Sequence, residues 1–122
     1  MTRRNFVTME VAPKLNWIDT HCHAYANAFA EDREAAVERA FEAGVERILL
    51  PNIDAASVQP LLDLVAAYPE RCFPMMGLHP CHVEENWEAE CVSILGALDA
   101  EPCIAVGGIG MDLFRGKETP LA

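Results

Sequence analysis

The sequence predicts an α/β fold, namely the N-terminal half of a (β/α)8 barrel with about four parallel strands and three intervening helices. Short apolar runs alternate with segments of helical period at a spacing of about 30 residues, a pattern typical of parallel strands joined by right-handed crossovers. The chain has 122 residues, whereas a complete barrel needs roughly 250. Four such strands are therefore half of a barrel, and we expect the fold to stop partway.

The first predicted helix lies between two predicted strands. Ala36, Val37, Ala40 and Phe41 recur at helical spacing among Glu and Arg residues, and Gly44 follows at the position where a glycine commonly ends a helix. We predict a strand over Leu15–His23, a loop over Tyr25–Ala30, a helix over Glu31–Ala43 and a strand over Val45–Leu50, ended by Pro51-Asn52.

The second half of the pattern repeats this order. Asp54 is a candidate N-cap for a helix that extends to about Tyr68. Pro60 removes an N–H from that helix, so the helix either kinks there or begins near Ser57. We predict further strands over Cys72–Leu78 and Cys103–Val106, separated by a helix over Trp87–Leu98.

The composition is that of a globular domain without a basic surface. Hydrophobic residues make up 52% of the chain and charged residues 23%, and the formal net charge is −10. This charge argues against broad binding of a phosphate backbone by the protein surface. It does not exclude a nucleic-acid substrate, because bound metal cations can invert the local charge.

The cysteines and the N-terminus indicate a cytoplasmic protein. The five cysteines are an odd number without a C-x-x-C pair, which favours reduced thiols over disulfides. No long apolar run follows the basic residues of the N-terminus, so we predict neither a signal peptide nor a membrane span. We expect residues 1–14 to be an extension that need not be ordered and residues 15–122 to form the half barrel.

Histidines follow the first and third predicted strands. Alternate side chains of a strand share a face, so Asp19, His21 and His23 are expected to point the same way. Two imidazoles on one face are half of a metal site. His79 follows the third strand, and the carboxyl ends of parallel strands meet at one edge, so it should reach the same place. The alternatives are a histidine pair held by neighbouring backbone groups and a structural His79 that caps its loop.

Four other features have structural interpretations beside functional ones. Asp19 either orients one of the imidazoles or holds the strand end, and Asp112 is interpreted as a turn or cap acceptor. His82 is expected on the loop surface. The glycines of 107–110 do not match a phosphate-binding loop, since the G-x-G-x-x-G spacing is absent and no Lys-Ser/Thr follows.

Three stretches carry a resemblance to a known family. The blocks Asp19–His23, Gly77–Pro80 and Val106–Asp112 are similar in content and order to the signature blocks of the TatD-type metal-dependent deoxyribonucleases, within the amidohydrolase-like superfamily. The resemblance covers the chain from about Trp17 onward. It implies a TIM-like (β/α)8 barrel with a divalent two-metal centre (Mg, Mn or Zn) that cleaves phosphodiester bonds of DNA.

The resemblance also implies roles for individual residues. His21 and His23 would bind a divalent metal, and His79 would lie by the substrate. The family's fourth-strand block usually reads Gly-Glu-x-Gly-Leu-Asp, with the Glu bridging two metals, and Gly108 stands at that position. The remaining family ligands come from later strands, which have no counterpart in this sequence. We therefore assign no catalytic residue and expect this chain to be inactive or weakly active.

Two alternative functions follow from the same residues. One is a non-catalytic half-barrel module that binds a metal or a partner; the unpaired edges of its first and last strands would favour self-association. The other is a different amidohydrolase-like activity on an amide or lactone, since the His-x-His of the first strand is shared across that wider group.

Overall fold

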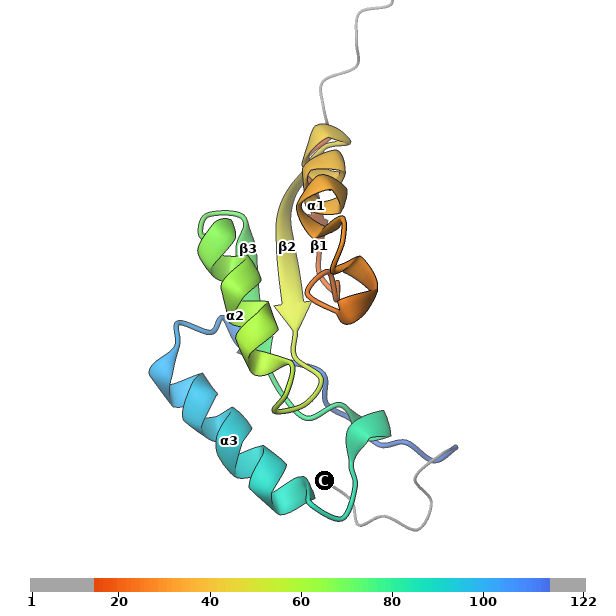
Figure 1. Ribbon diagram of the computed structural model, residues 1–122, viewed down its shortest axis with the longest axis vertical. Coiled ribbons are helices and arrows are strands. Elements are labelled where there is room, and N and C mark those ends of the chain that lie inside the picture. The colour runs from red at the N-terminus through yellow and green to blue at the C-terminus, as the bar shows by residue number, and fades with distance from the viewer. Residues whose placement is uncertain (1–14, 115–122) are drawn as a thin grey trace, which may run out of the picture.

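The computed structural model describes residues 15–114, so our predictions for residues 1–14 and 115–122 lie outside the described residues. Within them, the chain alternates strands and helices as predicted (Figure 1), and no helix there is both long and apolar enough to cross a membrane. The elements are β1 (Trp17–Asp19), η1 (Asn27–Phe29), α1 (Arg33–Glu42), β2 (Val45–Pro51), α2 (Val58–Ala67), β3 (Cys72–Met76), η2 (Pro80–His82), α3 (Trp87–Ala100) and β4 (Ala105–Val106).

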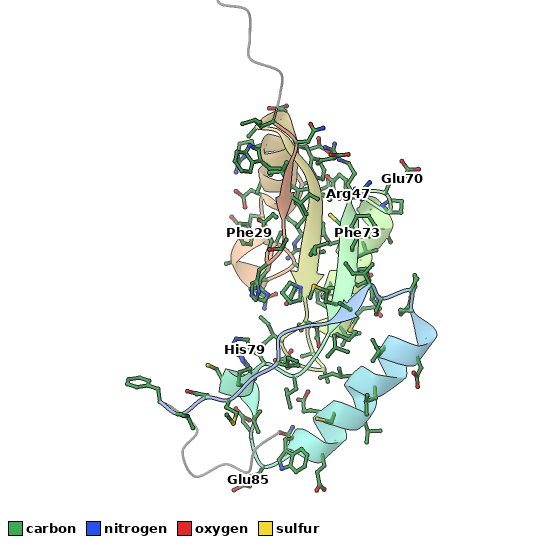
Figure 2. The ribbon with its side chains drawn as sticks, turned by 180° about the vertical axis from the view of Figure 1, so that it is seen from behind. Phe29, Arg47, Glu70, Phe73, His79 and Glu85 are labelled. Carbon is green, nitrogen blue, oxygen red and sulfur yellow. The ribbon has the colours of Figure 1, made fainter. Side chains whose placement is uncertain are left out.

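The strands form one parallel sheet in the order β1-β2-β3-β4. Helices α1 and α2 lie in front of this sheet in Figure 1, and the reverse view of Figure 2 has the strands in front of them. This is the curled half barrel that the sequence predicts. The carboxyl ends of all four strands lie at one edge, where a barrel carries its ligands.

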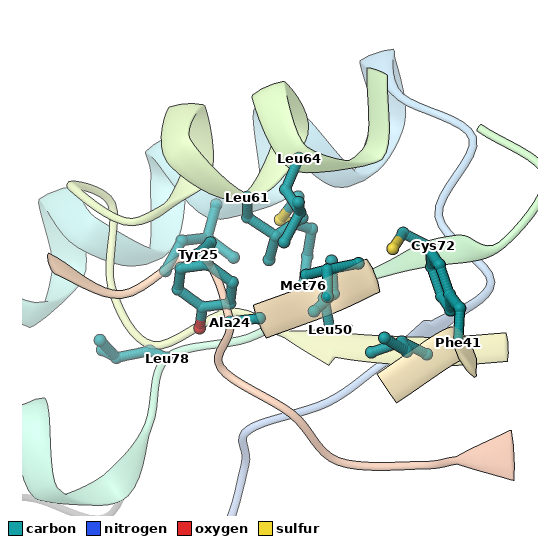
Figure 3. Close-up of a cluster of buried hydrophobic side chains, with 12 residues drawn as sticks. Ala24, Tyr25, Phe41, Leu50, Leu61, Leu64, Cys72, Met76 and Leu78 are labelled. Atoms are coloured by element: carbon teal, nitrogen blue, oxygen red, sulfur yellow. The ribbon is translucent and has the colours of Figure 1, made fainter. Parts of the chain in front are cut away.

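The hydrophobic core lies between the sheet and its helices (Figure 3). Alternate residues of β2 and β3 face the helices, and Ile48, Leu50, Cys72 and Met76 are buried there. The helices contribute buried apolar side chains that recur at helical spacing: Val37, Phe41, Leu61, Leu64 and Ile94. This packing fixes the sheet curvature and hence the positions of the loops at its carboxyl edge.

The first strand is shorter than predicted. It ends at Asp19 and not at His23, because the Asp19 carboxylate Oδ1 accepts a hydrogen bond from the backbone N–H of His21 (3.1 Å) and turns the chain. The backbone N–H of Cys22 still donates to the Leu49 carbonyl (3.1 Å), which keeps the segment beside β2. The histidines therefore lie on a loop held against the sheet, and the prediction that they continue a strand was wrong.

Helix α2 begins late enough to tolerate its proline. Ser57 is the N-cap and Pro60 lies in the first turn, where a missing N–H costs nothing because that group has no partner within the helix. Asp54 acts one turn earlier: its Oδ1 accepts from the Ser57 backbone N–H (2.8 Å). Of the two sequence-based alternatives, the start near Ser57 is confirmed.

Asn52 is a fully buried polar side chain at the carboxyl end of β2. Its Oδ1 accepts from the Gly77 N–H (3.1 Å), and its Nδ2 donates to the Asp54 carbonyl (2.5 Å) and to Ser57 Oγ (2.8 Å). These bonds join the loops that follow β2 and β3. The amide thus satisfies buried backbone groups that no regular ladder reaches.

The cysteines are all free, as expected for reduced thiols. Burial raises the pKa of Cys72 to about 11 and raises the pKa of Cys22 above its ordinary value. Both are therefore neutral at physiological pH and pack as small apolar side chains. Cys22, although next to both histidines in sequence, packs against the core and not into the site.

Candidate metal centre

The imidazoles of His21 and His23 converge beyond the end of β1. Their Nε2 atoms are 3.1 Å apart, and the rings meet edge to face with centroids 4.9 Å apart. Two nitrogens that each lie about 2.0–2.1 Å from one ion are about 2.8–3.4 Å apart for bond angles of about 90–110°. The observed separation falls in this range, so the pair fits two ligand positions of a single cation.

Tyr25 fixes the orientation of the His23 ring. Its hydroxyl donates to the Pro51 carbonyl, and its oxygen lies 2.8 Å from His23 Nδ1. Because the single hydroxyl proton goes to Pro51, the oxygen can only accept from His23, and Nδ1 must carry the proton. In the neutral ring Nε2 then bears the lone pair. Such a support is typical of metal-binding histidines, whose second nitrogen is held by a hydrogen bond.

The electrostatics of the pair favour the neutral, ligating form. Burial lowers the pKa of His23, and the neighbouring His21 lowers it further. Burial also raises the pKa of Tyr25 to about 12, so the phenol keeps its proton and its bond to the Pro51 carbonyl. His21 is exposed and His23 is half-buried, so one side of the pair opens to solvent and to a ligand.

His79 lies at the same carboxyl edge of the sheet (Figure 2). Its backbone N–H donates to the Ile53 carbonyl (2.7 Å), and its Nδ1 accepts from the Cys81 N–H (3.1 Å), so it caps η2. In the neutral ring this leaves the proton on Nε2, which makes that nitrogen a hydrogen-bond donor. His79 is also close enough to contribute to the lowered pKa of His23. His79 therefore caps η2 and also lies near the histidine pair.

The other candidate side chains do not complete a ligand set. Within residues 15–114, no group of three or more His, Cys, Asp or Glu side chains is placed to hold a metal ion. Asp19 Oδ1 accepts from the His21 backbone, and Asp112 Oδ1 accepts from the Phe114 N–H (3.0 Å), which is the turn role predicted for Asp112. His82 is exposed on η2. Two imidazoles fall short of the three protein ligands of a typical catalytic zinc.

Known proteins are similar to this chain in sequence and in fold. The model of the family described as "TatD related DNase" matches residues 18–122. The chain belongs to the TatD-related DNase family. Among TatD relatives, the metal-dependent hydrolase YjjV of Escherichia coli K12 is 37% identical over 100 residues, covering 80% of this chain and 38% of that protein. The 3′-5′ ssDNA/RNA exonuclease TatD of Erwinia tasmaniensis is 36% identical over 93 residues, covering 75% of this chain and 36% of that protein.

A solved TatD-family structure supports the fold in detail. The crystal structure of YjjV, a TatD homologue from Escherichia coli K12, superposes with a TM-score of 0.72 at 37% identity. The match covers 80% of this chain and 38% of that one. The chain thus matches less than two fifths of the length of these TatD relatives.

Two residues that support the histidine pair could not be predicted from the sequence. Tyr25 falls in a predicted loop, although a buried aromatic two residues after His23 is the signal that could have revealed it. Arg33, in α1, donates from its guanidinium to the carbonyls of Ala24 (2.9 Å), Tyr25 (2.9 Å) and Ala26 (3.0 Å). Arg33 therefore holds the loop that carries Tyr25. No local sequence pattern predicts hydrogen bonds between residues seven to nine positions apart.

Replacing Tyr25 by phenylalanine is expected to weaken divalent-metal binding by about 10–100-fold, because His23 loses the partner that orients its ring. The Pro51 carbonyl also loses its donor, which costs about 1–3 kcal/mol of stability. Titration with Zn²⁺ or Mn²⁺ measures the first effect and urea unfolding the second. The control is Tyr68→Phe, the same change at a half-buried tyrosine that packs beside Phe41. Equal affinities for the two variants would show that Tyr25 does not position the ligand.

Proposed function

We propose that this chain is the N-terminal half of a TatD-type metal-dependent phosphodiesterase, in which His21 and His23 bind one divalent cation and His79 contacts a phosphate of DNA. The observation that carries the proposal is the 3.1 Å approach of the two Nε2 atoms, with His23 held by the Tyr25 hydroxyl. The names of its relatives, a metal-dependent hydrolase and single-stranded DNA/RNA exonucleases, support this substrate class.

Each residue has a stated task in this proposal. His21 and His23 present two lone pairs to the cation, and Tyr25 keeps the His23 proton on Nδ1. His79 is held by the Cys81 N–H through Nδ1, so its Nε2–H can donate to a phosphate oxygen. A divalent ion at this place would polarise a phosphoryl oxygen as a Lewis acid. A bound cation would also offset the charge of −10 that opposes the approach of DNA.

The chain by itself is proposed to hydrolyse DNA weakly or not at all. Two imidazoles supply two contacts, and Gly108 stands where the family resemblance puts a bridging carboxylate. The same observations favour the second candidate, a non-catalytic half-barrel module that binds a metal or a partner. The two candidates share the metal site and differ in turnover, so metal binding and hydrolysis are tested separately.

Metal binding is tested by calorimetric titration of the chain with Zn²⁺ and with Mn²⁺. We expect saturable binding near one equivalent, and a loss of more than about 100-fold in affinity for His23→Ala, because a lost ligand costs more than a lost support of that ligand. His82→Ala, the removal of an exposed histidine on η2, is the matched control and should bind as the unaltered chain does. If His23→Ala and His82→Ala bind equally well, the pair is not the site.

Hydrolysis is tested with an end-labelled single-stranded oligonucleotide in the presence of Mg²⁺, Mn²⁺ or Zn²⁺. The proposal expects little or no shortening by this chain. Efficient shortening that His23→Ala abolishes would show that the pair suffices for catalysis and would overturn the inactive assignment. Shortening that His23→Ala leaves intact would point to a contaminating nuclease.

A further inference from the structure

We propose that a cavity beside the metal centre binds one unpaired nucleobase of a single strand, which stacks on His82 and is selected by Asp54. The inference rests on the proposed function and deepens it, because it names the part of a nucleic-acid substrate that the chain recognises besides a phosphate. Asp54 follows β2 and His82 follows β3, the two strands with a neighbour on each side. The two residues that recognise the base therefore belong to the interior of the sheet and not to its edges.

The cavity has a volume of about 220 Å³ and lies between the loops that follow the first three strands. Tyr25 and Asn27 line it from the loop after β1, Asp54 from the loop after β2 and His82 from η2. Sites for drug-sized ligands have about 300–1,000 Å³. This smaller space suits a single ring system and not a whole nucleotide.

Two residues that line the cavity also contact the candidate site. The hydroxyl oxygen of Tyr25 lies 2.8 Å from His23 Nδ1. The rings of His82 and His79 meet edge to face, with centroids 5.6 Å apart. A strand with one phosphate at these histidines would therefore present a neighbouring base to the cavity.

The chemistry of the lining suits a base better than a phosphate or a metal ion. The described residues that line the cavity include no lysine or arginine, and Asp54 brings a negative charge, which repels a phosphate. Within residues 15–114, no group of three or more His, Cys, Asp or Glu side chains is placed to hold a metal ion. An uncharged planar ring with hydrogen-bonding edges meets neither obstacle.

His82 provides a stacking surface. It is exposed, and its edge-to-face contact with His79 leaves at least one face of its ring uncovered by that neighbour. Proteins that bind single strands hold unstacked bases against aromatic rings, histidine included. In a duplex the bases are paired and stacked on each other, so only an unpaired base reaches this ring.

Asp54 and Asn27 provide the hydrogen bonds. Asp54 Oδ1 accepts from the Ser57 backbone N–H (2.8 Å), which holds the carboxylate in place, and a carboxylate has lone pairs for further donors. The exocyclic amino group of cytosine is such a donor, whereas thymine presents a carbonyl oxygen at the same place and would be repelled. Asn27 adds an amide that both donates and accepts. The cavity should therefore prefer cytosine to thymine.

Fluorescence anisotropy of short, labelled oligo(dC) and oligo(dT) in the presence of Mn²⁺ tests the inference. The unaltered chain should bind oligo(dC) about tenfold more tightly, since only cytosine makes the hydrogen bond to the charged carboxylate. His82→Ala should weaken this binding by about 5–100-fold, the usual effect of losing a stacking ring, and His82→Phe should restore it. Asp54→Asn keeps an acceptor for Ser57 but replaces one acceptor oxygen by a donor, so the preference for cytosine should be lost.

The matched control is Phe29→Ala, which removes an exposed aromatic ring of η1 that does not line the cavity. This variant should bind oligo(dC) as the unaltered chain does, and circular dichroism checks that each variant is folded. Three results overturn the inference: equal binding of the two oligonucleotides by the unaltered chain, no weakening by His82→Ala, or the same weakening by Phe29→Ala.

Deoxycytidine, a nucleoside without a phosphate, separates this inference from the proposed function. In metal-free solution and at millimolar concentration, it should shift the NMR signals of Asp54 and His82, and thymidine should shift them much less. If the proposed function fails, His23→Ala and His82→Ala bind metal equally well, yet these shifts persist. If the cavity does not bind a base, the shifts are absent while His23→Ala still loses the metal.

Discussion

Replacing Asn52 by alanine is expected to lower the free energy of unfolding by about 3–5 kcal/mol, the largest loss for any side-chain amide among residues 15–114. The side chain is fully buried and bonds to Gly77, Asp54 and Ser57. Its removal leaves the buried Gly77 N–H without this partner, takes one of two donors from the Asp54 carbonyl, which keeps the Ser57 hydroxyl, and opens a cavity. Urea unfolding followed by circular dichroism measures the loss.

The matched control is Asn86→Ala. Asn86 precedes α3 and makes no side-chain capping bond, so its replacement should change stability by less than about 0.5 kcal/mol. Similar losses for the two variants would mean that the hydrogen bonds of Asn52 contribute nothing beyond the propensity of asparagine for loops.

Asn52→Asp separates hydrogen bonding from volume. The carboxylate keeps the shape but cannot donate to Asp54 and Ser57. Burial should raise its pKa in the folded state above the unfolded value of about 3.9. A raised pKa of an acid means that folding favours the protonated form. The variant should therefore be most stable at low pH and lose stability as the pH rises from about 3.9 through the folded pKa. A loss of stability that does not vary with pH would contradict this account.

The order of elements could be predicted from the sequence because periodicity reports burial. Ile48 and Leu50 alternate with polar or half-buried neighbours, and Leu61 and Leu64 recur at helical spacing. These patterns arise because all four side chains face the same core. Pro60 left two alternatives for α2, a kink or a start near Ser57, and the structure has the start near Ser57. The family blocks extended this prediction to a half barrel, and the superposition with the YjjV structure confirms that fold.

The histidines of the candidate site could be selected from the sequence, but the contacts that bring them together could not be predicted. The sequence placed His21 and His23 on one strand face, whereas their convergence depends on the turn made by Asp19 and on the Tyr25 hydroxyl bonded to Pro51. These last two partners are 26 residues apart, and no local pattern encodes such a contact. The role of His21 and His23 as metal ligands, and of His79 at the substrate, stays a prediction.

Replacing Gly108 by glutamate, the residue that the family resemblance implies at this position, is expected to destabilise the chain by about 2–4 kcal/mol. We expect the added carboxylate not to create a second metal site in this backbone. Gly108 has φ +74°, and a Cβ there would lie 2.4 Å from the Asn52 carbonyl oxygen. The left-handed conformation alone costs a non-glycine residue about 1–2 kcal/mol, and the clash is with main chain held by the Asn52 bonds. Urea unfolding and metal stoichiometry measure the two outcomes.

The matched control for this change is Gly96→Glu. Gly96 lies within α3, and a Cβ added there would meet nothing within 4 Å, so glutamate should be neutral or stabilising by up to about 1 kcal/mol through helix propensity. A different outcome would contradict this account. If Gly108→Glu keeps full stability and binds a second metal equivalent, the segment 107–112 must move away from Asn52. The packing against Asn52 would then not be what requires a glycine at position 108. If stability falls and no second equivalent binds, position 108 cannot hold a carboxylate while the chain after β4 packs closely against Asn52. A metal ligand at position 108 would then require changes at both places.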